Sequence, residues 1–200
     1  MLKRRKIRES PFTIYLKNPF SILTIILRLA TAIWILFDPF YGTLIYMLGD
    51  TFDSTLLFYG AKFTFHQYHQ LDKLLDWTGY LAMMFVAMRY EIYPLLFLVF
   101  IYRLFGQLVF LFVKSDKVFL FFANFIEFTF FYQVVLNKLG VQFSFKNNYE
   151  IIILGCIWIF QLFREYTLHF WWPKFWKKNG NPRFVRSIGF DIKRKDFWDS

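Results

Sequence analysis

Residues 20–37 read FSILTIILRLATAIWILF, and Arg28 is the only charged side chain among them. A helix that crosses a bilayer needs roughly 20 mostly apolar residues, so this stretch has nearly the required length. The rest of the chain is similar: 57% of its 200 residues are hydrophobic, 30 are Phe and only 19% are charged. A water-soluble domain of this size cannot bury so much apolar surface, and a disordered chain has low hydrophobicity. We therefore expect an all-α integral membrane protein.

Six stretches have the length and composition of spanning helices, and together they form one transmembrane domain over residues 1–200. The turn over residues 89–94 carries charges, tyrosines and a proline, which is typical of an interfacial connection. The third stretch is the least apolar, so five spans with a re-entrant third segment remain an alternative. The six expected spans are Phe20–Phe37, Phe40–Tyr59, Asp72–Met88, Leu95–Val113, Val118–Leu136 and Glu150–Phe170.

The basic residues predict the orientation. The chain has 24 Lys and Arg against 14 Asp and Glu, with a net charge of +10. Most of them lie in a basic N-terminal segment (1–19), a basic and aromatic C-terminal tail (171–200) and the connections expected on that same side. The positive-inside rule therefore places both termini in the cytoplasm, in the cell (inner) membrane if the source is prokaryotic. We expect the basic residues to contact membrane lipids rather than nucleic acid.

The cysteine count, the N-terminal region and the histidines exclude or disfavour three further features. A single cysteine, Cys156, excludes an intramolecular disulfide framework and a cysteine-built zinc site. No small-residue cleavage site follows the first apolar run, so we expect no cleavable signal peptide. His66 and His69 form a His-x2-His pair, but without a third local ligand they favour an interfacial amphipathic connection over a zinc site.

Several charged residues fall inside the expected spans, where each costs roughly 2.5–3.5 kcal/mol even on mild scales. Such residues have to pair, bind ions or face water. Similar depths in adjacent spans predict an ion pair between Arg103 and Glu127, with a substrate role as the alternative. For Arg28 the natural partner is an acidic cluster on the second span. The charged residues concerned are Arg28, Asp50, Asp53, Arg103, Glu127 and Glu165.

The acidic cluster is the most informative pattern. Asp50 and Asp53 are three residues apart, and Asp72 and Asp76 are four apart, so each pair lies on one helix face. The two pairs are expected to meet near the cytoplasmic boundary, with Asp53 and Asp76 at similar depth. Carboxylates in a low dielectric repel one another, and hard cations such as Mg²⁺ or Mn²⁺ relieve this. Asp72 and Asp76 could alternatively be ordinary acids of a first helical turn.

Asp50-x2-Asp53 followed by Asp72-x3-Asp76 resembles the signature of the CDP-alcohol phosphotransferase (CDP-alcohol phosphatidyltransferase) superfamily. That pattern is D-x2-D-G-x2-A-R, then G-x3-D-x3-D, and it belongs to six-span proteins with cytoplasmic termini. The stretch from Asn18 to Arg28 also resembles the Pro-Asn-x-Leu-Thr-x-x-Arg opening of many members. The chain is a divergent match, because the residues at the glycine and Ala-Arg positions of the pattern are Ser54, Leu57, Phe58 and Tyr68.

The resemblance implies a divalent-metal-dependent transferase of phospholipid synthesis. A phosphatidyl or phospho-alcohol group passes from a CDP-linked donor to an alcohol acceptor, and CMP leaves. The implied ligands of Mg²⁺ or Mn²⁺ are Asp50, Asp53 and Asp72, with Asp76 near the metal as the general base. Lys62 is a candidate to replace the missing arginine of the motif, and a homodimer is allowed. A small transporter or cation pathway, or a non-catalytic membrane protein, is the alternative.

Overall fold

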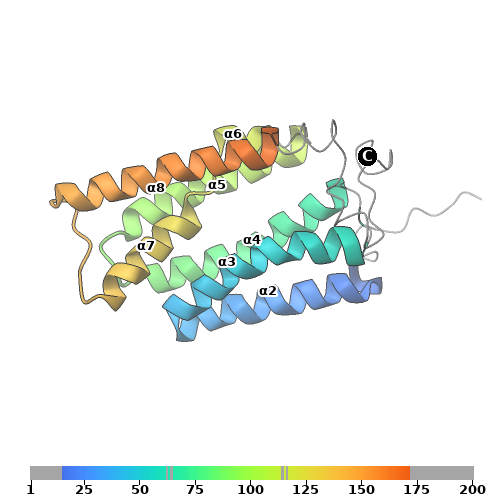
Figure 1. Ribbon diagram of the computed structural model, residues 1–200, viewed down its shortest axis with the longest axis horizontal. Coiled ribbons are helices and arrows are strands. Elements are labelled where there is room, and N and C mark those ends of the chain that lie inside the picture. Colours follow the sequence, from blue (N-terminus) through green and yellow to red (C-terminus); the bar gives the residue numbers. More distant parts are fainter. Residues whose placement is uncertain (1–14, 62, 64, 114, 116, 172–200) are drawn as a thin grey trace, which may run out of the picture.

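The computed structural model describes residues 15–171 except 62, 64, 114 and 116, and in this part of the chain every regular element is helical. The basic segments 1–14 and 172–200, Lys62 and Lys114 lie outside the described residues. Helices run roughly along the long axis of the molecule, with α2 and α8 on opposite sides (Figure 1). The helices are α2 (Pro19–Phe37), α3 (Pro39–Thr55), α4 (Phe65–Ala87), α5 (Tyr93–Val113), α6 (Val118–Phe121), α7 (Ile126–Lys138) and α8 (Asn148–Tyr166), with π-helical turns at Leu56–Gly60 and Thr167–Trp171.

α2 and α3 form a tight hairpin. The Asn18 side chain caps α2 by accepting hydrogen bonds from the next helical amides, and Asp38 caps α3 in the same way. A proline follows each cap, where its fixed φ suits the first helical position. The helices pack so closely that a Cβ on Gly42 would lie 2.5 Å from the backbone nitrogen of Ile35. Asp38 alone connects α2 to α3, which fixes the register of the two helices.

α4 begins at Phe65, seven residues before the expected start at Asp72. The predicted boundary was wrong because the histidine-containing connection continues the helix instead of lying apart from it. His69 is only 6% exposed, and its ring lies 4.9 Å from that of Tyr68 and 6.3 Å from that of Phe110. His69 therefore packs inside the bundle, and the interfacial depth expected for the His-x2-His pair stays a prediction. α4 packs against α2, α3, α5 and α7, so it is a central element of the fold.

The fifth expected span, Val118–Leu136, is not one continuous helix. α6 ends at Phe121, residues 122–125 are irregular, and α7 starts at Ile126. A Cβ on Gly106 of α5 would lie 2.2 Å from the Phe122 Cβ, so this glycine makes room for the break. The Tyr102 hydroxyl donates to the Phe121 carbonyl, and Arg103 donates to the Phe122 carbonyl. These donors replace hydrogen bonds that the buried backbone loses at the break.

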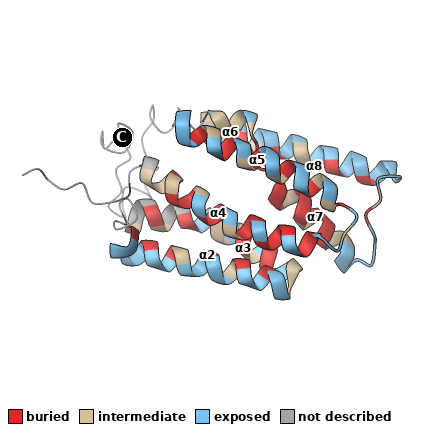
Figure 2. Cartoon of the chain, turned by 180° about the vertical axis from the view of Figure 1, so that it is seen from behind, coloured by how far each residue is buried: buried red, intermediate tan, exposed pale blue. Residues whose placement is uncertain are grey.

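Large apolar side chains cover much of the surface, and polar and charged side chains are buried beside the apolar core. Large apolar side chains face outward, including Ile33 (55% exposed), Leu98 (65%) and Phe163 (67%), and Figure 2 shows exposed faces along the outer helices. The interior contains many charged and amide side chains beside the apolar core. By length and composition, α2 and α5 could each cross a membrane. Charged residues lower the hydropathy of α4 and α8, and α3 and α7 are short, with 17 and 13 residues.

Candidate metal centre

Arg28 of α2 lies at the centre of an acidic cluster formed by α3 and α4. Its Nη2 is 2.9 Å from an oxygen of Asp50 and 2.7 Å from an oxygen of Asp76, and its Nε is 3.6 Å from Asp53. The side chain is 1% exposed and its guanidinium carbon lies 4.2 Å from the ring centroid of Tyr46. The expectation that Arg28 pairs with acidic residues of the second span is confirmed.

Lys73 is a second cation in the cluster. Its Nζ donates to Asp72 at 2.5 Å and to Asp76 at 3.1 Å. The Tyr80 hydroxyl donates to the same Asp76 oxygen at 3.3 Å. Sequence reasoning did not assign Lys73 to the site, although Lys73 and Asp76 are three residues apart and therefore share a helix face. Asp76 thus contacts Arg28, Lys73 and Tyr80 at once.

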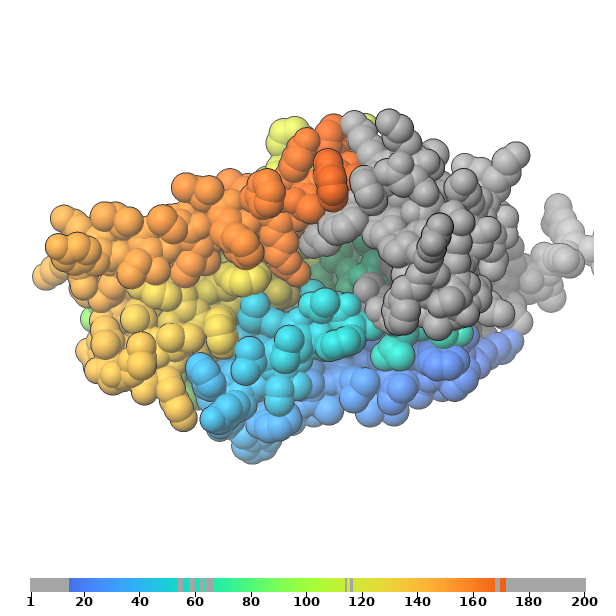
Figure 3. Space-filling view, in the orientation of Figure 1, coloured from blue at the N-terminus to red at the C-terminus, as the bar shows by residue number. Residues whose placement is uncertain are grey.

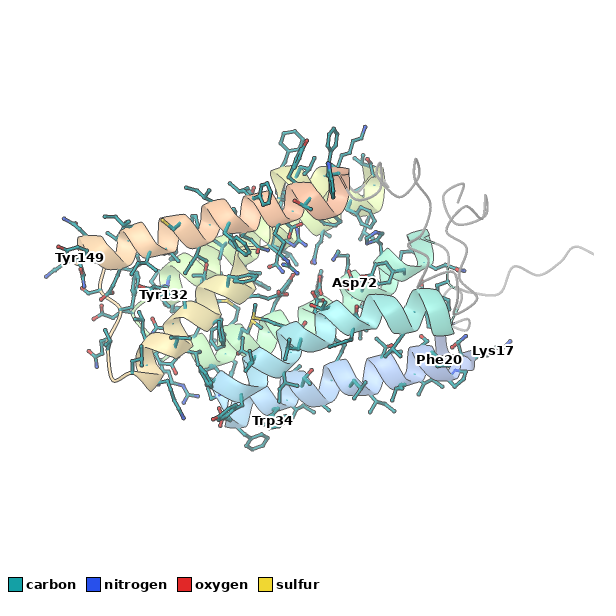
Figure 4. All side chains as sticks on the ribbon, in the orientation of Figure 1. Lys17, Phe20, Trp34, Asp72, Tyr132 and Tyr149 are labelled. Atoms are coloured by element: carbon teal, nitrogen blue, oxygen red, sulfur yellow. The ribbon has the colours of Figure 1, made fainter. Side chains whose placement is uncertain are left out.

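Three of the four predicted ligands come together in the structure. Asp50, Asp72 and Asp76 each offer a carboxylate oxygen, and these oxygens lie within 4.8 Å of one another. Asp53 is outside that group, and no hydrogen bond to either of its oxygens is found among the described residues. Figure 4 shows Asp72 in the interior between the helices, whereas Trp34 of α2 points outward.

All three of Asp50, Asp53 and Asp76 reach Arg28: Asp50 and Asp76 share its Nη2, and Asp53 lies near its Nε. The equal depth expected for Asp53 and Asp76 stays a prediction.

Charge in the cluster is only partly balanced. Four carboxylates face the guanidinium of Arg28 and the ammonium of Lys73, and Arg164 of α8 approaches Asp50 at 3.8 Å. Asp53, Asp72 and Asp76 are 2–4% exposed, so these charges interact in a low dielectric. An excess of buried negative charge favours binding of a further cation.

The expected ion pair between Arg103 and Glu127 was wrong. No contact of 4 Å or less joins these two side chains within the described chain. Arg103 instead donates to the Phe122 carbonyl and lies 4.6 Å from the ring centroid of Phe119. Glu165 accepts a hydrogen bond from the Asn124 amide at 3.3 Å. Arg103 and Glu165 thus both hydrogen-bond to backbone groups of the break between α6 and α7. The sequence did not reveal this break.

The positions at which the chain departs from the family motif are described in part. Leu57 is fully buried, and Tyr68 packs beside it in a small apolar cluster. The side chains of Ser54, Phe58 and His66 lie outside the described part of the structure.

No protein-family model matches the chain, and no curated protein or solved structure matches it significantly.

Proposed function

We propose that the chain spans the membrane six times, with both termini and the acidic cluster toward the cytoplasm. The outward apolar side chains of α2, α5 and α8 support this, because lipid is the solvent that accepts them. α6, the irregular residues 122–125 and α7 together form the fifth span, since α7 alone is about 20 Å long at 1.5 Å per residue. The charged interior is then the polar core of a helical bundle.

The donor set suits one hard divalent cation. Asp50, Asp72 and Asp76 offer oxygen ligands only, which is the chemistry that Mg²⁺ and Mn²⁺ prefer. Arg28, Lys73 and Arg164 balance most of the charge of the four carboxylates, and a bound divalent ion would offset the negative charge that remains. When bound, the ion would stabilise the charge that develops on phosphoryl oxygens.

We propose that this centre transfers a phosphatidyl or phospho-alcohol group from a CDP-linked donor to an alcohol, with release of CMP. The observation that carries the proposal is the convergence of Asp50, Asp53, Asp72 and Asp76 from two helices around Arg28.

Asp76 is the proposed general base for the acceptor hydroxyl. Its contact with Lys73 is the one most easily exchanged for substrate, because Lys73 is 15% exposed and has a long, flexible side chain. Arg28 holds Asp76 in place from the other side at 2.7 Å. In this proposal the buried Arg28 orients Asp76, and the more exposed Lys73 moves aside for the substrate.

The test is CMP release by the full chain in lipid nanodiscs, from a panel of CDP-linked donors and alcohols with Mg²⁺ or Mn²⁺. Asp76→Asn should abolish turnover, and Asp50→Asn should raise the metal concentration needed for half-maximal rate. Glu91→Gln, in the exposed turn after α4, is the control and should behave as the wild type. Absence of turnover across the panel, with no Mn²⁺ binding by electron paramagnetic resonance, would overturn the proposal.

A purely structural ion cluster is the second candidate. It is favoured by the close contacts of Arg28 and Lys73, which pair with carboxylates without any metal. In that case a chelator leaves the melting temperature unchanged, Mn²⁺ does not bind, and no donor is turned over. Metal binding with turnover excludes this candidate.

A further inference from the structure

A cleft of about 240 Å³ lies between α3, α7 and α8, next to the acidic cluster. Figure 3 looks onto the face of the molecule where these three helices meet. Leu44 and Leu48 of α3 form one wall, and Phe128 and Phe131 of α7 form the other. The volume is many times the roughly 10–15 Å³ that one water molecule needs. A cleft of this size and lining suits an apolar chain.

One end of the cleft is charged. Glu127 of α7 and Arg164 of α8 both line it. Glu127 is 1% exposed, and its Oε1 has no hydrogen-bond partner among the described residues. A buried carboxylate oxygen without a donor is costly, and a ligand that donates a hydrogen bond removes that cost. Arg164 also approaches the Asp50 carboxylate at 3.8 Å, so it links this end of the cleft to the acidic cluster.

The backbone break explains why Glu127 occupies this place. α7 starts at Ile126, so Glu127 lies in the first turn of a helix that begins inside the bundle. Negative charge is stabilised at a helix N-terminus by the unpaired amides and the helix dipole. A continuous helix over residues 118–136 would have no such terminus at this depth. The break therefore holds a carboxylate at the inner end of an apolar cleft.

The cleft also reaches the outer surface of the helices. Leu48 is 52% exposed and Leu44 36%, so the α3 wall continues onto the face that meets lipid in the proposed orientation. A ligand could enter sideways from the bilayer, with its chain along α3 and its polar end inward. Since Glu127 and Arg164 carry opposite charges, a neutral polar group fits this end better than an anion or an ammonium.

We propose that this cleft binds a single-chain lipid alcohol, whose hydroxyl donates to Glu127 Oε1 and whose chain lies between Leu48 and Phe128. The bound hydroxyl then shares the charged end of the cleft with Arg164, which approaches the Asp50 carboxylate of the proposed catalytic centre at 3.8 Å. In naming the acceptor, the inference rests on the proposed function, whereas binding itself requires no turnover.

The test is photolabelling of the full chain in nanodiscs by dodecanol that carries a diazirine in its chain. Label should appear on the peptides of α3 and α7 that line the cleft. Free dodecanol should compete, whereas dodecanoate and dodecylamine at the same concentration should not. Equal competition by the acid or the amine would overturn the proposal, because it would show that the hydroxyl is not recognised.

Two variants locate the binding. Leu48→Trp fills the cleft from an exposed position and should reduce labelling to background, whereas Leu98→Trp, on the exposed face of α5, should not. Glu127→Gln should weaken dodecanol competition about tenfold, because a charge-assisted hydrogen bond is roughly twice as strong as a neutral one. Labelling that survives both cleft variants would contradict the inference.

The two proposals fail in different ways. If dodecanol binds in the cleft but no CDP-linked donor is turned over, the transferase proposal is wrong and the binding site stands. If CMP is released at the wild-type rate by Leu48→Trp with a long-chain alcohol as acceptor, the transferase stands and the cleft is not its acceptor site.

Discussion

Around Arg28, buried charges meet opposite charges, whereas between α6 and α7 buried charges meet backbone groups. Arg28 contacts three carboxylates from two other helices. Arg103 donates to the Phe122 carbonyl, and Glu165 accepts hydrogen bonds from the Asn124 backbone amide and the Gln161 side chain. Removal of Arg28 leaves carboxylates unpaired. Removal of Arg103 leaves a neutral backbone carbonyl without its donor. The energetic consequences should therefore differ.

The comparison also separates two uses of arginine. Near the carboxylates, Arg28 uses two different nitrogens, Nη2 for Asp50 and Asp76 and Nε for Asp53, whereas a lysine ammonium has a single nitrogen. Near the break, the hydrogen bond from Arg103 to the Phe122 carbonyl is one that an ammonium could also donate. A lysine should therefore replace Arg103 far better than it replaces Arg28.

The largest effect should come from Arg28→Ala. It leaves Asp50, Asp53 and Asp76 without their central cation, and breaking a buried ion pair from one side typically costs about 3–5 kcal/mol. The free energy of unfolding, measured in detergent, should fall by about this amount, and Arg28→Lys should not restore it. Arg89→Ala, on the exposed turn, should change it by about 0.5 kcal/mol at most. A stable Arg28→Ala protein would mean that the carboxylates do not depend on this guanidinium.

Arg103→Ala should have the next largest effect. The Phe122 carbonyl then loses its donor inside the bundle, which costs about 1–3 kcal/mol. Hydrogen exchange should accelerate over residues 122–129, and Arg103→Lys should return both exchange and stability most of the way. If the lysine variant behaves like the alanine variant, the ring contact with Phe119 matters more than the hydrogen bond.

Lys73→Met should change metal affinity, in addition to the stability lost when Asp72 and Asp76 lose this partner. Its ammonium lies between Asp72 and Asp76, where it competes with a divalent cation. Removal of that positive charge should tighten Mn²⁺ binding at least about tenfold, or about 1.4 kcal/mol. Titration of free Mn²⁺ by electron paramagnetic resonance measures the change. Lys138→Met, at the exposed end of α7, serves as the matched control and should not alter Mn²⁺ binding.

Trp158→Phe should have the smallest effect. The Trp158 Nε1 donates to the Thr129 hydroxyl at 2.9 Å, and its ring stacks on Phe125 beside the break. The substitution keeps the ring and loses one neutral hydrogen bond, so stability should fall by about 1 kcal/mol. A loss as large as that of Arg103→Ala would show that the tryptophan, rather than the arginine, secures the start of α7.

The sequence predicted the cluster well because its information is local. Spacings of three and four residues place two carboxylates on one helix face whatever the surroundings, and the cost of Arg28 in an apolar span demands a nearby acid. Helix class and the limits of α2 and α5 follow equally directly from apolar runs and caps. The early start of α4 was missed because His69 and its neighbours look interfacial in sequence, although tertiary packing buries His69.

The break could not be predicted from residues 118–136 themselves, which are as apolar as a continuous span. It depends on Gly106, Tyr102 and Arg103 of a different helix, which admit Phe122 and satisfy the freed carbonyls. The ion pair expected for Arg103 followed from depth alone, and depth does not reveal that a backbone group competes for the same guanidinium. The sequence indicated that a charged Glu127 is costly in an apolar span. Its position in the cleft could not be predicted, because it depends on the break before α7.

The single-residue joint at Asp38 has a consequence for biogenesis. Because Arg28 and Asp50 belong to the same hairpin, these opposite charges can pair as soon as α3 leaves the ribosome, before α4 has been synthesised. In the proposed six-span arrangement, Arg28 then enters the bilayer already paired with Asp50. Insertion of either segment alone would expose an unpaired ion to hydrocarbon.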